Sequence, residues 1–145
     1  MAQPFTLLLR VRYGECDAQQ VVFNARYGDY IDVAATEFYR VLFGSYQALL
    51  ERGLDSQVVR MNTDWSSSAR FDDVLELRVQ TLRLGTTSYS LQVDILQHAE
   101  QRLVARSEIT YVMIDARSFT KVAIPDDLRA RFEQGAPGVL INQAG

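Results

Sequence analysis

Asp17 is the residue whose type and position most favour chemistry. It lies in a polar stretch, residues 14–20, between a predicted strand and the start of the longest predicted helix. The first amides of a helix lack partners within the helix, and together with the helix dipole they favour an oxyanion. A carboxylate beside such amides suits a thioester, because a thiolate leaves with little help from an acid and no histidine is required. The alternative is an aspartate that only caps a turn.

The sequence excludes several other chemistries. It contains one histidine, His98, and one cysteine, Cys16. No Gly-x-Ser-x-Gly elbow is present to serve a histidine-dependent triad, and a zinc site needs more His or Cys ligands than these two. The glycine motifs that bind phosphates or dinucleotides are also missing. We therefore expect His98 to be a surface turn residue, Cys16 to be an inert packed thiol, and the protein to use no metal and no cofactor.

Length and composition favour one soluble domain spanning residues 1–145. The chain is 48% hydrophobic and 23% charged, and its net charge of −3 offers no basic surface for nucleic acid. No apolar run reaches the roughly 18 residues of a membrane-spanning helix, and the N-terminus does not resemble a signal peptide. A single cysteine cannot form an intrachain disulfide, which fits a reducing compartment. We expect a cytoplasmic protein with no nucleic-acid partner and no membrane span.

The spacing of apolar residues predicts a strand followed by a long helix. Residues 5–13 alternate as a strand does, and residues 25–43 follow a helical period. One face of the strand comprises Leu7, Leu9, Val11 and Tyr13. The apolar stripe of the helix comprises Tyr27, Ile31, Ala34, Phe38 and Val41. Asn24 is the expected N-cap of the helix, and Gly44 is its expected C-terminal stop.

The rest of the chain is predicted to be rich in strands. The further elements are a short helix at 46–52, strands at 57–65, 74–84, 87–97 and 102–115, and a closing helix from Pro125 to about residue 133. Short links between these strands indicate antiparallel pairing. The fold class is therefore α+β, a long central helix wrapped by an antiparallel sheet of about five strands, with a mobile tail from about residue 135. One helix cannot cover such a sheet, so we expect a homodimer.

The segment from Arg12 to Tyr27, RYGECDAQQVVFNARY, resembles the signature of hot-dog thioesterases of the 4-hydroxybenzoyl-CoA thioesterase and YbgC type. That signature has an aromatic residue, an acidic residue, Thr or Cys, and Asp, and then Gly-Val-Val and an aromatic pair. Residues 68–76, 82–89 and 124–128 are similar to later segments of the same family. The resemblance implies a hot-dog fold and hydrolysis of an acyl-CoA, with CoA present only as part of the substrate. It also implies a homodimer or homotetramer with active sites at the subunit interface.

The resemblance also implies roles for individual residues. Asp17 matches the catalytic aspartate, acting either as a nucleophile or as a general base. Asn24 matches the position whose backbone N–H polarises the thioester carbonyl. Phe23 and Tyr27 match positions near the acyl pocket.

Gln20 stands where the family commonly has glycine, so the loop is either strained or takes another path. This departure leaves open a protein that binds acyl-CoA or acyl carrier protein without hydrolysing it. A purely structural dimer is a third alternative.

Other polar residues carry weaker expectations. The candidates for binding the CoA phosphates are Arg70, Arg83 and Arg106, each of which could equally be a solvated arginine on a strand face. Asp32 and Glu37 lie on the long helix, where a solvated role is favoured. The triplet at residues 66–68, Ser-Ser-Ser, could bond the substrate, although a plain turn is favoured.

Overall fold

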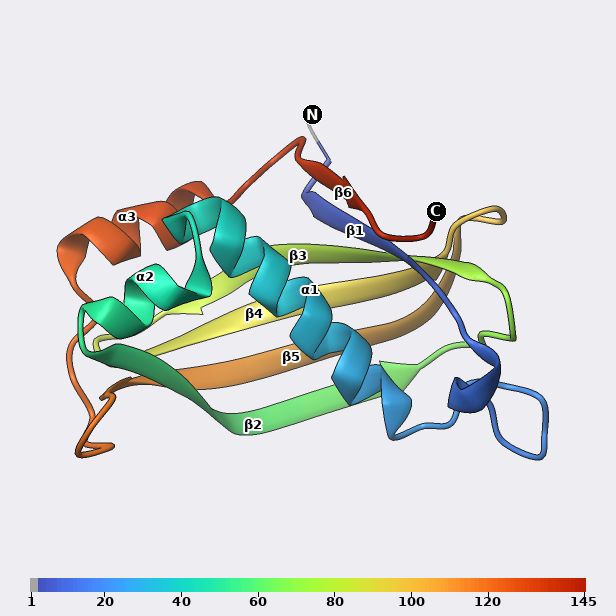
Figure 1. The fold of residues 1–145 in the computed structure, drawn as a ribbon, viewed down its shortest axis with the longest axis horizontal. Helices are drawn as coiled ribbons and strands as arrows, with labels where there is room; N and C mark the ends of the chain where they lie inside the picture. Colours follow the sequence, from blue (N-terminus) through green and yellow to red (C-terminus); the bar gives the residue numbers. More distant parts are fainter. Residues whose placement is uncertain (1–2) are drawn as a thin grey trace.

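A long helix, α1 (Arg26–Phe43), lies across a six-stranded sheet in the computed structural model, which describes residues 3–145 (Figure 1). The strands are β1 (Phe5–Arg10), β2 (Leu54–Trp65), β3 (Val74–Leu84), β4 (Ser88–Gln97), β5 (Arg102–Asp115) and β6 (Leu140–Asn142). Their order in the sheet is β2-β5-β4-β3-β1-β6, and every pair is antiparallel except β1 with β6. The shorter helices are η1 (Tyr13–Glu15), α2 (Tyr46–Glu51) and α3 (Asp126–Gln134). The predicted α+β class, with a long helix on an antiparallel sheet, is confirmed.

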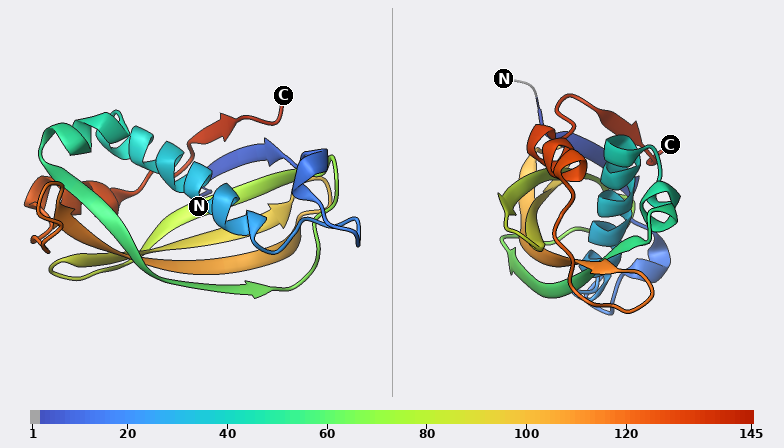
Figure 2. Two further views of the ribbon diagram at one scale, coloured as in Figure 1. Left: turned by 60° about the horizontal axis from the view of Figure 1, so that its bottom comes forward. Right: turned by 90° about the vertical axis from the view of Figure 1, so that its left-hand side faces the viewer.

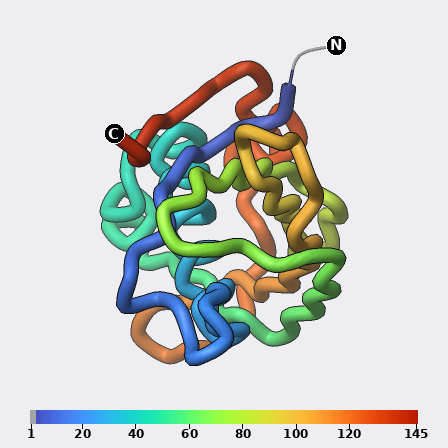
Figure 3. Tube along the Cα trace, turned by 90° about the vertical axis from the view of Figure 1, so that its right-hand side faces the viewer, coloured from blue at the N-terminus to red at the C-terminus, as the bar shows by residue number. Residues whose placement is uncertain are grey.

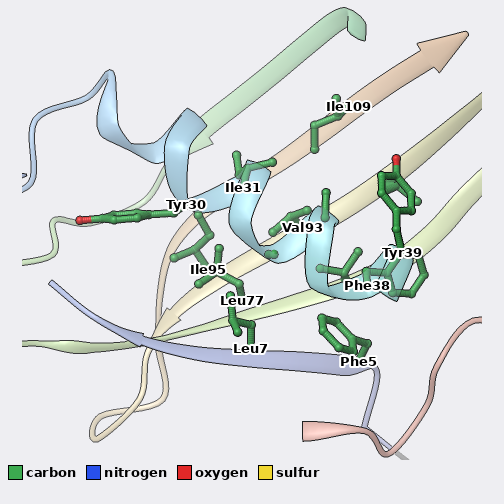
Figure 4. Packing of buried hydrophobic residues seen from close by; sticks show 14 of the residues in the cluster. Phe5, Leu7, Tyr30, Ile31, Phe38, Tyr39, Leu77, Val93, Ile95 and Ile109 are labelled. Atoms are coloured by element: carbon green, nitrogen blue, oxygen red, sulfur yellow. The ribbon is translucent and has the colours of Figure 1, made fainter. Parts of the chain in front are cut away.

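Helix α1 packs on the concave face of the sheet. The right-hand view of Figure 2 shows the sheet curving around the helix. Figure 4 shows apolar side chains of α1 facing those of the sheet, Leu77, Val93, Ile95 and Ile109 among them. The predicted stripe is buried except for Val41, which is 37% exposed, while Leu42 beside it is buried instead. The ordinary period of 3.6 residues carries the buried face from Phe38 to Leu42 and leaves Val41 outside.

The C-terminal end of α1 was predicted correctly, and the N-terminal cap was not. The helix stops at Gly44, as expected, with a positive φ of 87° that glycine adopts without steric cost. At the N-terminus the prediction was wrong. The N-cap is Ala25, and no side chain caps the helix. Asn24 contributes only its carbonyl oxygen, which accepts a bond from the backbone N–H of Tyr27 at 3.4 Å.

The boundaries of β1 to β5 lie within three residues of the predicted ones, and β3 and β5 match them. Strand β1 ends at Arg10, three residues before the predicted end, because Tyr13 belongs to the single-turn helix η1. The side chain of Tyr13 is 82% exposed and shares no buried face with Leu7 and Leu9. The chain turns here because the Glu15 carboxylate accepts a hydrogen bond from the Arg12 backbone N–H at 2.8 Å.

The C-terminal segment differs from the mobile tail that we expected. Residues Leu140–Asn142 form β6, which pairs with Thr6–Leu8 of β1. Further bonds flank the strand, from Thr6 N–H to the Val139 carbonyl at 3.0 Å and from Gln143 N–H to the Leu8 carbonyl at 2.8 Å. The sheet therefore has six strands and not about five.

The other edge of the sheet is β2, which pairs with β5 on one side and has no strand on its outer side within residues 3–145. Its exposed apolar side chains are Val58, Val59, Met61 and Trp65. No helix within residues 3–145 is both long enough and apolar enough to cross a bilayer.

Candidate active site

Asp17 lies in a tight loop that joins η1 to the segment leading into α1. The loop is a small hairpin, because Cys16 and Val22 form an antiparallel bridge and the Asp17 N–H donates to the Val21 carbonyl at 2.9 Å. The Gln20 N–H closes the turn on the Asp17 carbonyl at 2.9 Å. Gln20 has a φ of 66°, so it occupies the left-handed region that glycine would occupy without strain.

The loop is held at one end of the molecule by the segment that joins β2 to β3. Val21 forms an antiparallel bridge with Arg70, and the Val22 N–H donates to the Ala69 carbonyl at 2.8 Å. Figure 3 looks onto this end, where the blue loop lies beside the green segment. These bonds pair backbone to backbone, so they fix the path of the loop whatever its side chains are.

The Asp17 carboxylate is partly buried and only partly engaged. Its Oδ1 accepts a hydrogen bond from the Gln19 N–H at 2.8 Å, so the turn-capping role occurs. The other oxygen has no hydrogen bond within residues 3–145. Asp17 is one of the residues that line a pocket of about 380 Å³; the others are Tyr13, Cys16, Gln20, Arg70 and Phe71. Asp17 is therefore a pocket residue with one carboxylate oxygen that has no hydrogen-bond partner within residues 3–145.

Asn24 and its neighbours lie at the start of α1. The backbone N–H groups of Asn24 and Ala25 have no hydrogen-bond partner among the described residues. Phe23 is 46% exposed, whereas Tyr27 is 3% exposed and packs edge-on against Trp65, with ring centres 5.7 Å apart. Neither aromatic side chain lines the Asp17 pocket in a single chain.

The three candidate arginines lie in different places. Arg70 lines the Asp17 pocket, and its guanidinium forms no ion pair within residues 3–145. Arg106 binds Asp94 through two bonds of 2.7 and 3.2 Å, and Arg83 lies 3.9 Å from Glu108. The structure therefore brings Arg70 together with Asp17 and pairs the other two with carboxylates elsewhere on the sheet.

Ser67 and His98 both lie in turns, as the sequence indicated. Ser67 lies in a turn, where its hydroxyl donates to the Leu103 carbonyl at 2.7 Å. His98 lies in the turn between β4 and β5 and is half exposed, but its Nδ1 also lies 2.6 Å from a carboxylate oxygen of Glu76.

The other expectations concern Cys16 and the acidic residues of α1. Burial, and then the carboxylates of Glu15, Asp17 and Asp73, raise the pKa of the Cys16 thiol, which favours the protonated form. Asp32 is exposed on α1. Glu37 is partly buried and accepts bonds from Arg40 and Gln143.

Two features of the site were not singled out from the sequence. Tyr13 and Phe71 contact each other edge to face at 6.0 Å on the wall of the pocket, although both rings are more than half exposed. Glu15 accepts a hydrogen bond from the Tyr30 hydroxyl at 2.9 Å, across 15 positions of sequence. An aromatic residue among polar neighbours weakly indicates a binding surface, so the sequence held a weak indication of Phe71. Nothing in the sequence indicated the Glu15–Tyr30 contact.

The sequence from residue 11 to residue 132 matches the model of the thioesterase-like superfamily. The chain belongs to that superfamily. The acyl-CoA thioester hydrolase YbgC of Escherichia coli O6:H1 is 31% identical over 126 residues, which cover 87% of this chain and 93% of YbgC. The 4-hydroxybenzoyl-CoA thioesterase of a Pseudomonas species is 23% identical over 88% of this chain and 96% of its own length.

Among solved structures, the probable thioesterase YbaW of Escherichia coli superimposes with a TM-score of 0.78 at 27% identity. The superposition covers 90% of this chain and 97% of YbaW. The resemblance that the sequence indicated is thus confirmed. The chain has the hot-dog fold.

Proposed function

We propose that this protein hydrolyses an acyl-CoA thioester to the free acid and CoA, with Asp17 as the catalytic carboxylate. The observation that carries the proposal is that Asp17 lines a pocket, keeps one carboxylate oxygen without a hydrogen bond within residues 3–145, and lies in a loop held by backbone pairing before α1. The backbone N–H of Asn24 has no hydrogen-bond partner within residues 3–145 and would donate to the thioester oxygen. Relatives of this chain named as acyl-CoA thioester hydrolases support the same substrate class.

The chemistry needs only groups that this chain provides. As a nucleophile, the free oxygen of Asp17 adds to the carbonyl carbon, the C–S bond breaks, CoA leaves as the thiolate, and water hydrolyses the resulting anhydride. As a general base, Asp17 takes a proton from a water molecule that attacks the same carbon. In both routes negative charge develops on the carbonyl oxygen, which the N–H of Asn24 and the helix dipole would stabilise. Neither route requires a metal or a cofactor.

The cation for a CoA phosphate is best supplied by Arg70. It lines the pocket of Asp17 and has no ion pair among the described residues, so binding a phosphate would not break an existing contact. Arg83 and Arg106 already face Glu108 and Asp94, and a phosphate would have to compete with these carboxylates. Of the three candidates, Arg70 has the strongest support.

A homodimer completes the proposed site. Strand β2 is an open edge with exposed apolar side chains, and Trp65 at its end packs against Tyr27 of α1. A second copy paired along β2 would cover these side chains and lie beside the half-exposed Phe23, where the acyl group is proposed to bind. A dimer of such dimers and a cytoplasmic location remain part of the same proposal.

The decisive test is Asp17→Asn in a thiol-release assay with short, long and aromatic acyl-CoAs. Asparagine keeps the oxygen that accepts the Gln19 N–H and removes only the carboxylate. We expect kcat to fall by about 10²–10⁴-fold with little change in thermal stability. Asp115→Asn is the matched control, since Asp115 caps a turn through Oδ1 in the same way at the other end of the molecule. Full turnover by Asp17→Asn would refute the role of Asp17.

The alternative is a protein that binds acyl-CoA or acyl carrier protein without turnover. The strained backbone at Gln20 is the observation that favours it, because the family's usual glycine would fit this position without strain. Measurable binding of acyl-CoA, with no thiol released from any member of the panel, would favour this alternative.

A further inference from the structure

Glu15 joins three segments of the chain that meet at the proposed site. Its Oε1 accepts hydrogen bonds from the Arg12 N–H at 2.8 Å and from the Tyr30 hydroxyl at 2.9 Å. Its main-chain carbonyl accepts a third bond from the Phe23 N–H at 2.9 Å. The residue therefore connects the end of β1, helix α1 and the segment that leads into α1.

These contacts bracket both groups of the proposed catalytic pair. Asp17 follows Glu15 by two residues, and Asn24 follows Phe23 directly. The bond between the Phe23 N–H and the Glu15 carbonyl closes the base of the loop. The bond from Tyr30 ties that base to α1, so the same residue sets where the carboxylate and the amide lie relative to the helix.

Tyr30 is built to donate this bond. Its side chain is 4% exposed, its ring packs edge-on against Tyr27 at 5.9 Å, and its hydroxyl points away from the aliphatic cluster (Figure 4). Burial, and then the hydrogen bond to Glu15, raise the pKa of Tyr30, so the hydroxyl stays protonated. A hydrogen bond from a hydroxyl to an ionised carboxylate is stronger than one between two neutral groups.

We propose that Glu15 and Tyr30 are positioning residues, which hold the Asp17 loop against α1 in the geometry that thioester hydrolysis requires. This inference rests on the proposed function. The remaining tertiary bonds of the loop run from backbone to backbone, to residues 69 and 70 and not to α1. Loss of the Tyr30 bond would leave the loop folded but displaced from the helix.

The test compares Tyr30→Phe, Glu15→Ala and Glu15→Gln in the full chain. A displacement of about 1 Å can cost about 10²-fold in rate, so we expect the first two variants to lose about 10- to 100-fold in kcat. Their KM should change by less than about threefold, because the substrate contacts remain. Glutamine keeps the acceptor oxygen, so Glu15→Gln should retain most of the wild-type kcat.

Tyr46→Phe is the matched control. The Tyr46 hydroxyl also donates to a carboxylate, that of Asp55, but at the other end of α1. We expect a similar change in melting temperature for Tyr46→Phe and Tyr30→Phe, with kcat unchanged in Tyr46→Phe.

Each outcome decides between the two proposals. Wild-type kcat in Tyr30→Phe and Glu15→Ala, with Asp17→Asn inactive, would overturn the positioning role and leave the proposed function intact. Glu15→Gln as impaired as Glu15→Ala would also overturn it, since the acceptor oxygen would not be what matters. An active Asp17→Asn protein would overturn both.

Discussion

Glu76 is the only buried charged residue within residues 3–145, and it lies on the sheet face opposite α1. Its carboxylate lies 2.9 Å from Arg78 Nη2, 2.6 Å from His98 Nδ1 and 2.6 Å from Gln101 Nε2. Burial by itself would raise the pKa of Glu76, but the hydrogen bonds from Gln101, His98 and Arg78 outweigh burial and lower this pKa. The only histidine of the chain thus serves a structural carboxylate.

This arrangement makes stability depend on pH. A carboxyl whose folded pKa is lowered stabilises the fold above its unfolded pKa, near 4.5, and that contribution is lost as the pH falls through the folded value. Glu76→Gln should lower the free energy of unfolding by about 1–3 kcal/mol at neutral pH. Below about pH 4.5 the gap between wild type and variant should narrow. Urea unfolding across this pH range is the measurement.

The control for this prediction is Glu108→Gln. Glu108 is partly exposed on β5 and lies 3.9 Å from Arg83, so its removal should change stability by less than about 0.5 kcal/mol at any pH. A gap between wild type and Glu76→Gln that stays constant down to pH 3 would show that the charge of Glu76 is not what the cluster stabilises.

At the residue scale, the sequence singled out Asp17 and Arg70, which do line one pocket, but it did not predict the contacts around them. Asp17 was singled out by its place before a helix. For Gln20 the sequence left open a strained loop or another loop path, and its φ of 66° corresponds to the first of these. The Glu15–Tyr30 bond could not be predicted from the sequence, because it joins residues 15 positions apart. It also depends on the three-residue helix η1, which is too short to show a pattern of apolar residues. The Asn24 cap was wrong for a related reason, since the first turn of α1 begins one residue later.

At the element scale, the long amphipathic segments and the short helices α2 and α3 were predicted to within a few residues, whereas β6 was not predicted. Strand β3 alternates from Leu75 to Val79 with its apolar side chains buried toward α1, and this pattern identified the strand. Strand β6 has three residues, too few for any period, and its place depends on hydrogen bonds to β1. The end of β1 was overestimated, because alternation continues through Tyr13 after the ladder has stopped.

Strand β6 covers the edge of β1, which would otherwise be open to aggregation with other chains. The first five residues of β1, Phe5–Leu9, are buried, and four of them are apolar. An open edge of this composition favours pairing with other chains, whereas a three-residue edge strand offers little to pair with.

We therefore expect deletion of residues 138–145 to lower the melting temperature and to produce large particles in light scattering. Leu140→Ala is the control, because this side chain is 58% exposed and its backbone pairing with Thr6 would remain. A deletion variant as stable and as monodisperse as the full chain would show that β6 does not protect β1.

At the scale of the whole molecule, the two sheet edges differ in length and in cover. Strand β2 has 12 residues and no partner on its outer side in the described part of the chain, whereas the β1 side ends in β6. The exposed apolar residues of β2 have no explanation within one chain. The proposed dimer through β2 accounts for them and leaves the β1 side free.

The corresponding prediction is that Met61→Lys disrupts the dimer. Met61 is 40% exposed near the middle of β2, and a lysine there would place a charge in the pairing edge. We expect a shift from dimer to monomer by light scattering, with a loss of at least about tenfold in kcat/KM if the site needs both subunits. Leu82→Lys, at 37% exposure on β3, is the control and should leave the mass unchanged. An unchanged mass for Met61→Lys would place the contact elsewhere.

Trp65 is the only tryptophan in the chain. It lies at the end of β2, 48% exposed, in edge contact with the buried Tyr27. Selective excitation of its indole thus yields fluorescence from a single point beside the start of α1. A second chain or a ligand that covers this ring would shift the emission to shorter wavelengths. Binding at α2 or α3, away from Trp65, would leave the emission unchanged. The protein carries its own optical reporter, so subunit association and substrate binding can be followed in solution without any label.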